Sequence, residues 1–157
     1  MVDKIEKLIE MKPQFTLSVS LHAPNDALRS EMMPINNRWN VERLLTACRR
    51  YAQVTRRRIS FEYSLIKGKN DTEQCALELA GQLKGMLCHV NLIPVNTVKG
   101  NSYERSSPKQ IQKFINILES RGITATVRRT LGADINASCG QLRRKKKEES
   151  DENLQQD

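Results

Sequence analysis

The strongest constraint on the fold is a repeated alternation of amphipathic helical segments with short apolar segments typical of strands. Strands are predicted at residues 15–21, 58–66, 88–95 and 123–127, each preceded by a segment with helical periodicity. This alternation predicts an α/β fold with a parallel sheet and right-handed crossovers. Four such units are too few for a closed eight-stranded barrel. The pattern therefore favours either half of such a barrel or the small end of a doubly wound sheet.

Capping residues mark where the predicted helices begin. The predicted caps are Asn40 for one helix, Asp71 with Gln74 as a capping box for the next, and Ser107 with Pro108 and Gln110 for the last. Between the first strand and the Asn40 helix we expect a loop, in which Asn25 and Asp26 are turn residues. The helix after Asp71 should bury one apolar face, made of Ala76, Leu79, Ala80, Leu83 and Leu87.

The net charge of +8 belongs to the part of the chain that should fold. The segment 143–157 contains five basic and five acidic residues, so the whole excess lies in residues 1–142. We expect 1–142 to form one domain and 143–157 to be a charged, disordered tail. A basic domain favours a polyanionic partner such as nucleic acid, although many basic proteins bind none.

The four cysteines are widely spaced and match no zinc or disulfide framework. Reduced thiols in a cytoplasmic protein are the simplest explanation. Cys48 lies on the apolar face of its helix and is predicted to belong to the core. No apolar run approaches the roughly 20 residues of a transmembrane helix, and residues 1–7 do not form a signal peptide.

Unusual polar residues follow the predicted strands at their carboxyl ends, where parallel α/β folds bind ligands. Strand 15–21 leads through Ser20 and Leu21 to His22, strand 88–95 leads to Asn96, and the last strand leads towards Cys139. Purely structural roles are open for each of them. His22 could bond the loop backbone and Asn96 could cap a loop. His89, inside a strand, is expected to be structural.

Cys139 lies between Gly132 and Gly140, in a segment where the backbone could approach a ligand closely. A cysteine in such a loop could act as a nucleophile if its pKa were lowered, and Arg128 and Arg129 are near in sequence. The alternative is a small buried hydrophobic residue.

Four segments together resemble the C-terminal half of a known enzyme family. They are SLHAPND at 20–26, MPIN at 33–36, NLIPVN at 91–96 and GADINASCGQL at 132–142, in that order. The chain from residue 1 to 142 is similar to the radical-SAM methyltransferases that methylate C2 of an adenine in 23S rRNA and tRNA. The resemblance implies a partial, half barrel of parallel β/α units with about four strands.

The resemblance also implies roles for individual residues. Ser20, Leu21, His22 and Asn96 would contact S-adenosylmethionine. Cys139 would accept a methyl group on its sulfur, and a radical step dependent on a 4Fe-4S cluster would pass that carbon to the adenine. The cluster ligands of the family form a Cys-x-x-x-Cys-x-x-Cys run, which this sequence does not contain. The chain is therefore expected to be a fragment that is inactive alone.

The family further implies cytoplasmic partners: 23S rRNA, tRNA and a reductant such as flavodoxin or ferredoxin, with a monomeric full-length enzyme and no membrane. Three alternatives stay open. The chain could be a non-catalytic RNA-binding remnant, a relative that methylates C8 of adenine, or a half-barrel metabolic enzyme. The last has no glycine-rich phosphate loop or metal-ligand cluster to support it.

Overall fold

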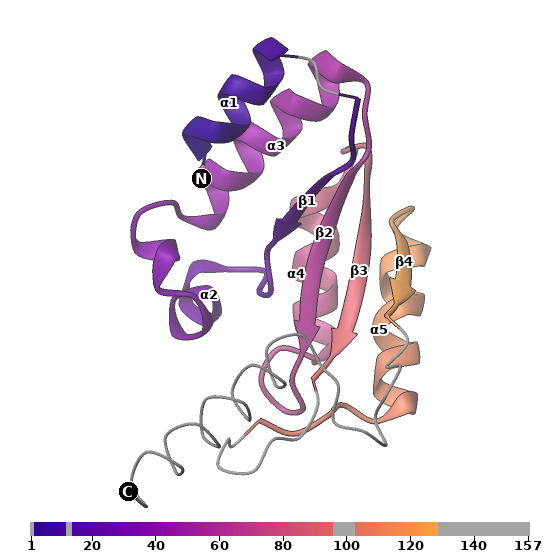
Figure 1. The fold of residues 1–157 in the computed structure, drawn as a ribbon. Helices are drawn as coiled ribbons and strands as arrows, with labels where there is room; N and C mark the ends of the chain where they lie inside the picture. The colour runs from indigo at the N-terminus through magenta and orange to yellow at the C-terminus, as the bar shows by residue number, and fades with distance from the viewer. Residues whose placement is uncertain (1, 12–13, 96–102, 129–157) are drawn as a thin grey trace, which may run out of the picture.

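The computed structural model describes residues 2–11, 14–95 and 103–128. Helices and strands alternate along the chain, as predicted (Figure 1). The elements are α1 (Val2–Met11), β1 (Leu17–Ser20), α2 (Asp26–Met32), the 3-10 helix η1 (Pro34–Asn37), α3 (Val41–Thr55), β2 (Ile59–Leu65), α4 (Glu73–Leu83), β3 (Cys88–Pro94), α5 (Pro108–Ser120) and β4 (Thr124–Val127).

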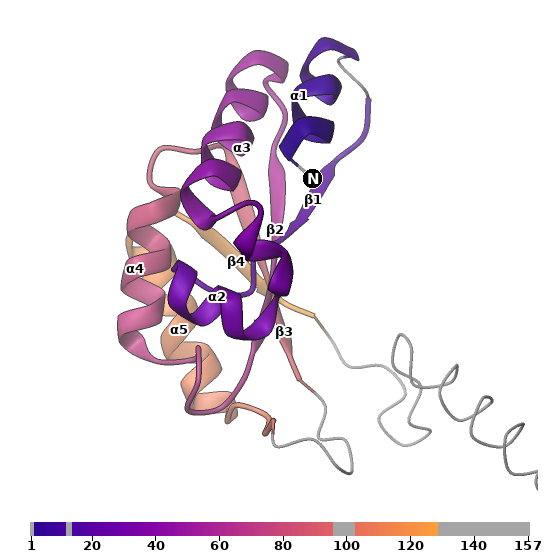
Figure 2. The same ribbon diagram turned by 90° about the vertical axis from the view of Figure 1, so that its left-hand side faces the viewer.

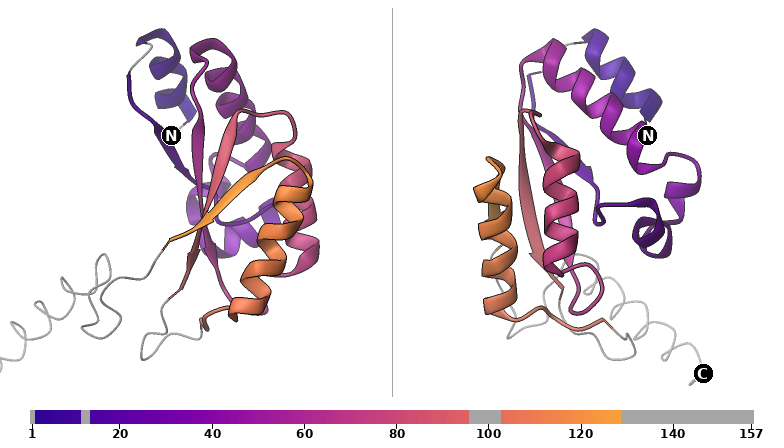
Figure 3. Two further views of the ribbon diagram at one scale, coloured as in Figure 1. Left: turned by 90° about the vertical axis from the view of Figure 1, so that its right-hand side faces the viewer. Right: turned by 180° about the vertical axis from the view of Figure 1, so that it is seen from behind.

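The four strands form one sheet in the order β1-β2-β3-β4, and every neighbouring pair is parallel. This confirms the predicted parallel sheet. A doubly wound sheet reverses its strand order at a switch point and carries helices on both faces. Here the order never reverses, and α3, α4 and α5 all pack on one face (Figures 2 and 3). The architecture is therefore that of a partial β/α barrel.

The core lies between the sheet and these helices. Side chains alternate along β2 and β3, with every second residue buried. Phe61, Tyr63, Val90 and Leu92 face the helices and are completely buried. Helix α1 packs mainly against α3 and adds Ile5 and Ile9 to the same core. The opposite face of the sheet carries no described helix and is partly exposed.

Two of the predicted helix caps are confirmed and one is wrong. The side chains of Asn40 and Ser107 accept hydrogen bonds from the third residue after each of them. The predicted role of Gln110 as capping-box partner of Ser107 is not confirmed, because its side chain donates to Asp71 O instead. The cap of α4 is Thr72, whose hydroxyl accepts from the Cys75 amide at 3.2 Å. Asp71 lies too early to cap this helix. It accepts from the Gly68 amide at 2.8 Å and so closes the preceding turn.

Three other expectations are corrected. The predicted loop after the first strand contains helix α2, and Asn25 is its N-cap, accepting from the Leu28 amide at 3.0 Å. Strand β1 is shorter than predicted, because Phe15 lies outside it and is exposed. Leu87 is also exposed, because α4 ends at Leu83 and the chain has turned before residue 87.

The predicted tail, 143–157, lies outside the described residues. None of the helices in the described part of the chain has the length and hydrophobicity of a transmembrane segment.

Candidate functional site

The uncovered face of the sheet is lined by polar side chains in two rows that run across the strands. The strand register places Ser20, Glu62, Asn91 and Thr126 in one row, and Ser18, Ser60, His89 and Thr124 in the next. All eight are partly or fully exposed, whereas their neighbours in sequence on β2 and β3 are buried. In a closed barrel this face would line the interior, so we take it as the candidate site.

Hydrogen bonds connect the side chains of this polar face. Asn91 Nδ2 donates to Glu62 Oε2 at 2.8 Å, and the Ser60 hydroxyl donates to Glu62 Oε1 at 3.3 Å. His89 Nε2 lies 2.8 Å from the Thr126 hydroxyl. The Glu62 carboxylate is therefore held in place, and its two oxygens retain capacity to accept from a ligand.

His22 lies just beyond the carboxyl end of β1, next to β2. Its Nδ1 accepts a hydrogen bond from the Ser64 amide at 3.0 Å, so the expected structural role in bonding the backbone is present. Burial lowers the pKa of His22, the Arg29 cation lowers it further, and Glu62 opposes both. The imidazole is therefore neutral at pH 7, and Nε2 makes no hydrogen bond to any described residue.

Ser20 and Leu21 connect the polar face to His22. The Leu21 side chain is completely buried, and its amide donates to Glu62 O at 3.0 Å. The Leu21 carbonyl accepts from Arg29 Nε at 3.1 Å, so both backbone groups of Leu21 are bonded inside the protein. The Ser20 hydroxyl is partly exposed and makes no hydrogen bond to the described residues. The groups at this strand end that can meet a ligand are thus the Ser20 hydroxyl and His22 Nε2.

Asn96 and Cys139 lie outside the described residues. Asn96 comes two residues after the end of β3. Arg128, the last described residue, donates its amide to Leu92 O at 2.8 Å, beside β3. Because all four strands are parallel, the carboxyl end of β4 lies at the same end of the sheet as the carboxyl end of β1. The contacts of Asn96, Ser20, Leu21 and His22 with a cofactor, and the role of Cys139, stay predictions.

Two buried residues next to the site escaped sequence reasoning. Arg29 donates to the carbonyls of Ser20 and Leu21, at the carboxyl end of β1, and Asn70 donates to the carbonyl of His22 at 2.8 Å. Arg29 lies in the segment that was expected to be a loop, and Asn70 in the turn after β2. Their partners are mostly backbone oxygens, which leave no pattern in a sequence. The nearby signals were the SLHAPND segment, which begins at the last residue of β1 and contains His22, and the MPIN segment, which contains Asn36, a partner of Arg29.

Two solved structures share this fold. A radical SAM methyltransferase from Sphaerobacter thermophilus has a TM-score of 0.85 and 50% identity, over 90% of this chain and 41% of that one. A domain of a pyruvate-formate lyase-activating enzyme from Bacteroides vulgatus has a TM-score of 0.64 and 21% identity, over 81% of this chain and 74% of that one. The second likeness shows the fold alone.

Curated relatives match nearly the whole chain. Probable dual-specificity RNA methyltransferases RlmN from Clostridium botulinum and Clostridium novyi are 56% and 55% identical over 143 residues, which is 91% of this chain. The RlmN of Lachnospira eligens is 50% identical over 151 residues, or 96% of this chain. No protein-family model matches the sequence.

The chain belongs to the RlmN family of RNA methyltransferases. It spans about 42% of the length of the relatives and corresponds to their C-terminal half. The resemblance inferred from the four motifs is confirmed at the level of the family.

RlmN-type enzymes are radical SAM proteins, and the described residues do not fit the 4Fe-4S cluster that this chemistry implies. Cluster ligands are thiolates that face one another. Cys48, Cys75 and Cys88 are all buried, on α3, α4 and the helix-facing side of β3. Burial raises the pKa of Cys48 to about 12 and that of Cys88 to about 11, which opposes thiolate formation. Within the described ranges no three His, Cys, Asp or Glu side chains are grouped to hold a metal ion.

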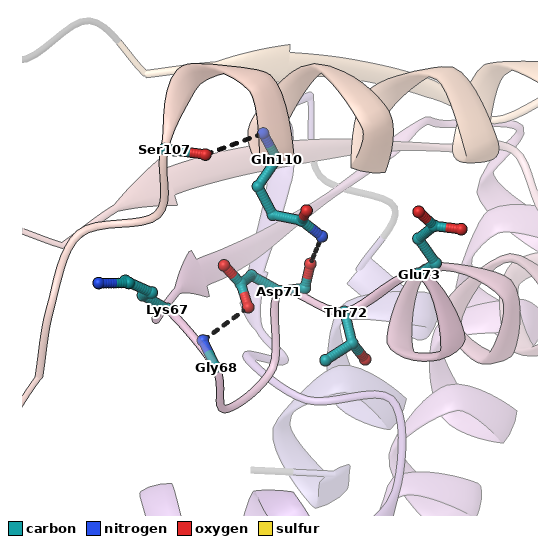
Figure 4. Close-up of a pocket in the computed structure, with 7 residues that line it drawn as sticks. All are labelled: Lys67, Gly68, Asp71, Thr72, Glu73, Ser107 and Gln110. Atoms are coloured by element: carbon teal, nitrogen blue, oxygen red, sulfur yellow. Dashed lines mark hydrogen bonds between the residues drawn. The ribbon is translucent and has the colours of Figure 1, made fainter.

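A surface hollow of about 420 Å³ lies away from the polar face, between the first turns of α4 and α5 (Figure 4). Its lining residues are Lys67, Gly68, Asp71, Thr72, Glu73, Ser107 and Gln110. The Asp71 carboxylate accepts from Gly68, and the Asp71 carbonyl accepts from Gln110 Nε2 at 2.5 Å. These groups shape the turn that joins β2 to α4. None of Ser20, Leu21 and His22 lines this hollow, so the polar face is the better candidate for an RlmN-type site.

Proposed function

We propose that this chain provides the S-adenosylmethionine-binding face and the methyl-accepting cysteine of an RNA methyltransferase that modifies C2 of an adenine in 23S rRNA and tRNA. The observation that carries the proposal is the open polar face, which leads to His22 in a chain 56% identical to RlmN relatives over 143 residues. We propose in addition that the whole enzyme is cytoplasmic and that flavodoxin or ferredoxin serves as its reductant.

The polar face suits the chemical groups of S-adenosylmethionine. That molecule offers ribose hydroxyls, an α-ammonium group and an α-carboxylate. The Glu62 carboxylate can accept from hydroxyls or from the ammonium group, and the Ser20 hydroxyl can serve either as donor or as acceptor. Neutral His22 offers an Nε2–H donor. Asn96 would add an amide from the end of β3.

In the proposed reaction the Cys139 sulfur carries the transferred carbon. The Cys139 thiol would first lose its proton to solvent. The thiolate would then attack the methyl carbon of S-adenosylmethionine, so that a carbon–sulfur bond forms at Cys139, the bond from that carbon to the sulfonium breaks and S-adenosylhomocysteine leaves. C2 of adenine is not nucleophilic, so the onward transfer needs radical chemistry that a cofactor must supply. The described residues do not fit that cofactor, and we assign this part of the reaction to the portion of the enzyme that the chain does not span.

A chimera with a relative tests this proposal. The present chain would replace the matching 143 residues of the Clostridium botulinum RlmN, and the chimera would be expressed in bacteria that lack their own enzyme of this type. Nucleoside mass spectrometry of 23S rRNA and tRNA should detect 2-methyladenosine with the chimera and none with its Cys139→Ala variant. The unaltered relative is the positive control.

Other outcomes favour the alternatives. A chimera that yields 8-methyladenosine instead would assign the C8 reaction. A chimera that binds RNA with a steep salt dependence but leaves every adenine unmodified, although the relative is active, would support a non-catalytic RNA-binding remnant.

A further inference from the structure

His22 adopts a backbone conformation that its side chain does not favour. Its φ is 59°, in the left-handed region, and the only other non-glycine residue with positive φ in the described part of the chain is Arg56. A single residue of this kind costs of order 1 kcal/mol or more, and it persists only where the surroundings impose it. The contacts around His22 should therefore show what holds the backbone in this left-handed conformation.

Asn70 holds His22 from the side of β2. Asn70 is completely buried, and its Nδ2 donates to His22 O at 2.8 Å and to Ser64 O at 2.6 Å. Its Oδ1 accepts from the Ile66 amide at 2.8 Å. One amide side chain thus ties the end of β1 to the end of β2, and it fixes the carbonyl of His22 directly.

Arg29 holds the same segment from the side of α2. It is only 1% exposed, and Nε donates to Leu21 O at 3.1 Å, while Nη2 lies 3.4 Å from Ser20 O. Nη1 donates to Asn36 Oδ1 at 2.8 Å and to Trp39 O at 3.0 Å. Each of these acceptors is uncharged. Burial lowers the pKa of Arg29, and the nearby Asp26 carboxylate opposes this effect by favouring the charged guanidinium. The Arg29 cation in turn helps to lower the pKa of the His22 imidazole.

The resulting geometry selects one form of the His22 ring. A backbone amide can only donate, so the bond from the Ser64 amide requires Nδ1 to be unprotonated. The charged groups that act on the ring are Arg29, which disfavours the imidazolium, and Glu62, which favours it. With the ring neutral, its one proton must be on Nε2.

We propose that Arg29 and Asn70 are positioning residues that fix His22 in its left-handed conformation. They thereby hold its ring against the Ser64 amide, which selects the Nε2–H form and so presents a hydrogen-bond donor beside the polar face. The identity of the acceptor, a group of S-adenosylmethionine, rests on the proposed function. The positioning itself does not, and it can be measured without any cofactor.

Histidine-selective ¹⁵N labelling of the full 157-residue chain gives a direct test, because the sequence contains only two histidines. His89 serves as the internal control, since its Nε2 bonds Thr126 on another part of the sheet. In the unaltered chain the nitrogen shifts of His22 should show the Nε2–H form, with a pKa below the ordinary histidine value. A strong amide-to-α-proton contact at His22 should report its positive φ, because the two protons lie closer in that conformation.

Variants then separate positioning from simple folding. In Arg29→Gln the pKa of His22 should rise while that of His89 stays unchanged, and Arg29→Lys, which keeps the cation, should preserve the low value. Asn70→Ala should weaken the preference for the Nε2–H form and the signature of positive φ. Arg38→Gln removes a cation that lies over the Trp39 ring nearby, and it should change neither signal.

The spectrum of the unaltered chain is decisive even if a variant fails to fold. A His22 ring protonated on Nδ1, or one with an ordinary pKa, would overturn the proposal. So would a pKa of His22 that does not move in folded Arg29→Gln. A separate experiment adds S-adenosylmethionine to the labelled chain. If His22 shows the Nε2–H form and the lowered pKa but its signals do not change with the cofactor, the positioning of His22 is supported and the proposed function is contradicted.

Discussion

At the scale of residues, two buried thiols link the stability of the fold to pH. Cys48 and Cys88 are held in the core with pKa values raised to about 12 and about 11, mainly by burial. A thiol whose pKa is higher in the folded than in the unfolded chain stabilises the fold fully below the unfolded pKa. That contribution is lost as the pH rises towards the folded pKa.

This predicts a decline in stability at alkaline pH. The free energy of unfolding should fall as the pH rises from about 9, the ordinary cysteine pKa, because unfolding releases buried thiols to ionise. Urea denaturation between pH 7 and 10.5 would measure it. In Cys48→Ala the slope should be shallower, at a cost of about 1 kcal/mol at pH 7 from the lost buried sulfur. An identical slope in this variant would contradict the assignment.

At the scale of elements, helix α3 ends on an arginine where glycine would fit better. Arg56 is the C-cap of α3, and its φ of 58° is left-handed. Glycine is the usual residue at such a helix end, because it has no Cβ to strain the backbone. We expect Arg56→Gly to stabilise the chain by roughly 0.5–1 kcal/mol.

A matched variant in the same helix gives the opposite sign. Arg43→Gly removes the same charge from an exposed position in the first turn of α3, where glycine should cost about 1 kcal/mol of helix stability. Chemical denaturation of both variants would compare them. If Arg56→Gly is as destabilising as Arg43→Gly, the strain at residue 56 is not present in solution.

The elements also show how far the sequence could predict this fold. The cap at Asn40 and the periodicity of α3 are local, so helix and buried face could both be predicted. Helix α2 was missed because Pro24 and Asn25 indicate a turn equally well as a helix start. The site was predicted only in outline. Arg29 and Asn70 act through carbonyls 6 to 48 residues away along the chain, and those contacts exist only once the sheet has formed.

At the scale of the whole molecule, the described strands form an open sheet and not a closed barrel. Strand β1 pairs only with β2 and strand β4 only with β3 within the described residues, so two edges have free backbone groups. No described helix covers the polar face of the sheet. Open strand edges promote pairing with another copy of the chain.

We therefore expect the isolated chain to self-associate. Sedimentation velocity over a range of protein concentrations should show dimers or larger species whose share grows with concentration. The chimera with the relative, in which the missing part of the barrel is supplied, should be monomeric. A monodisperse monomer of the isolated chain with a cooperative thermal transition would show that these edges are protected in some other way.

We propose above that the sulfur of Cys139 carries the transferred carbon before it reaches the RNA. Peptide mass spectrometry of the active chimera, purified from cells, tests it most directly. The account predicts a methyl group on Cys139 and none on Cys48, Cys75 or Cys88, which are buried in the core. An unmodified Cys139 in enzyme that methylates RNA, or full activity in Cys139→Ala, would contradict it.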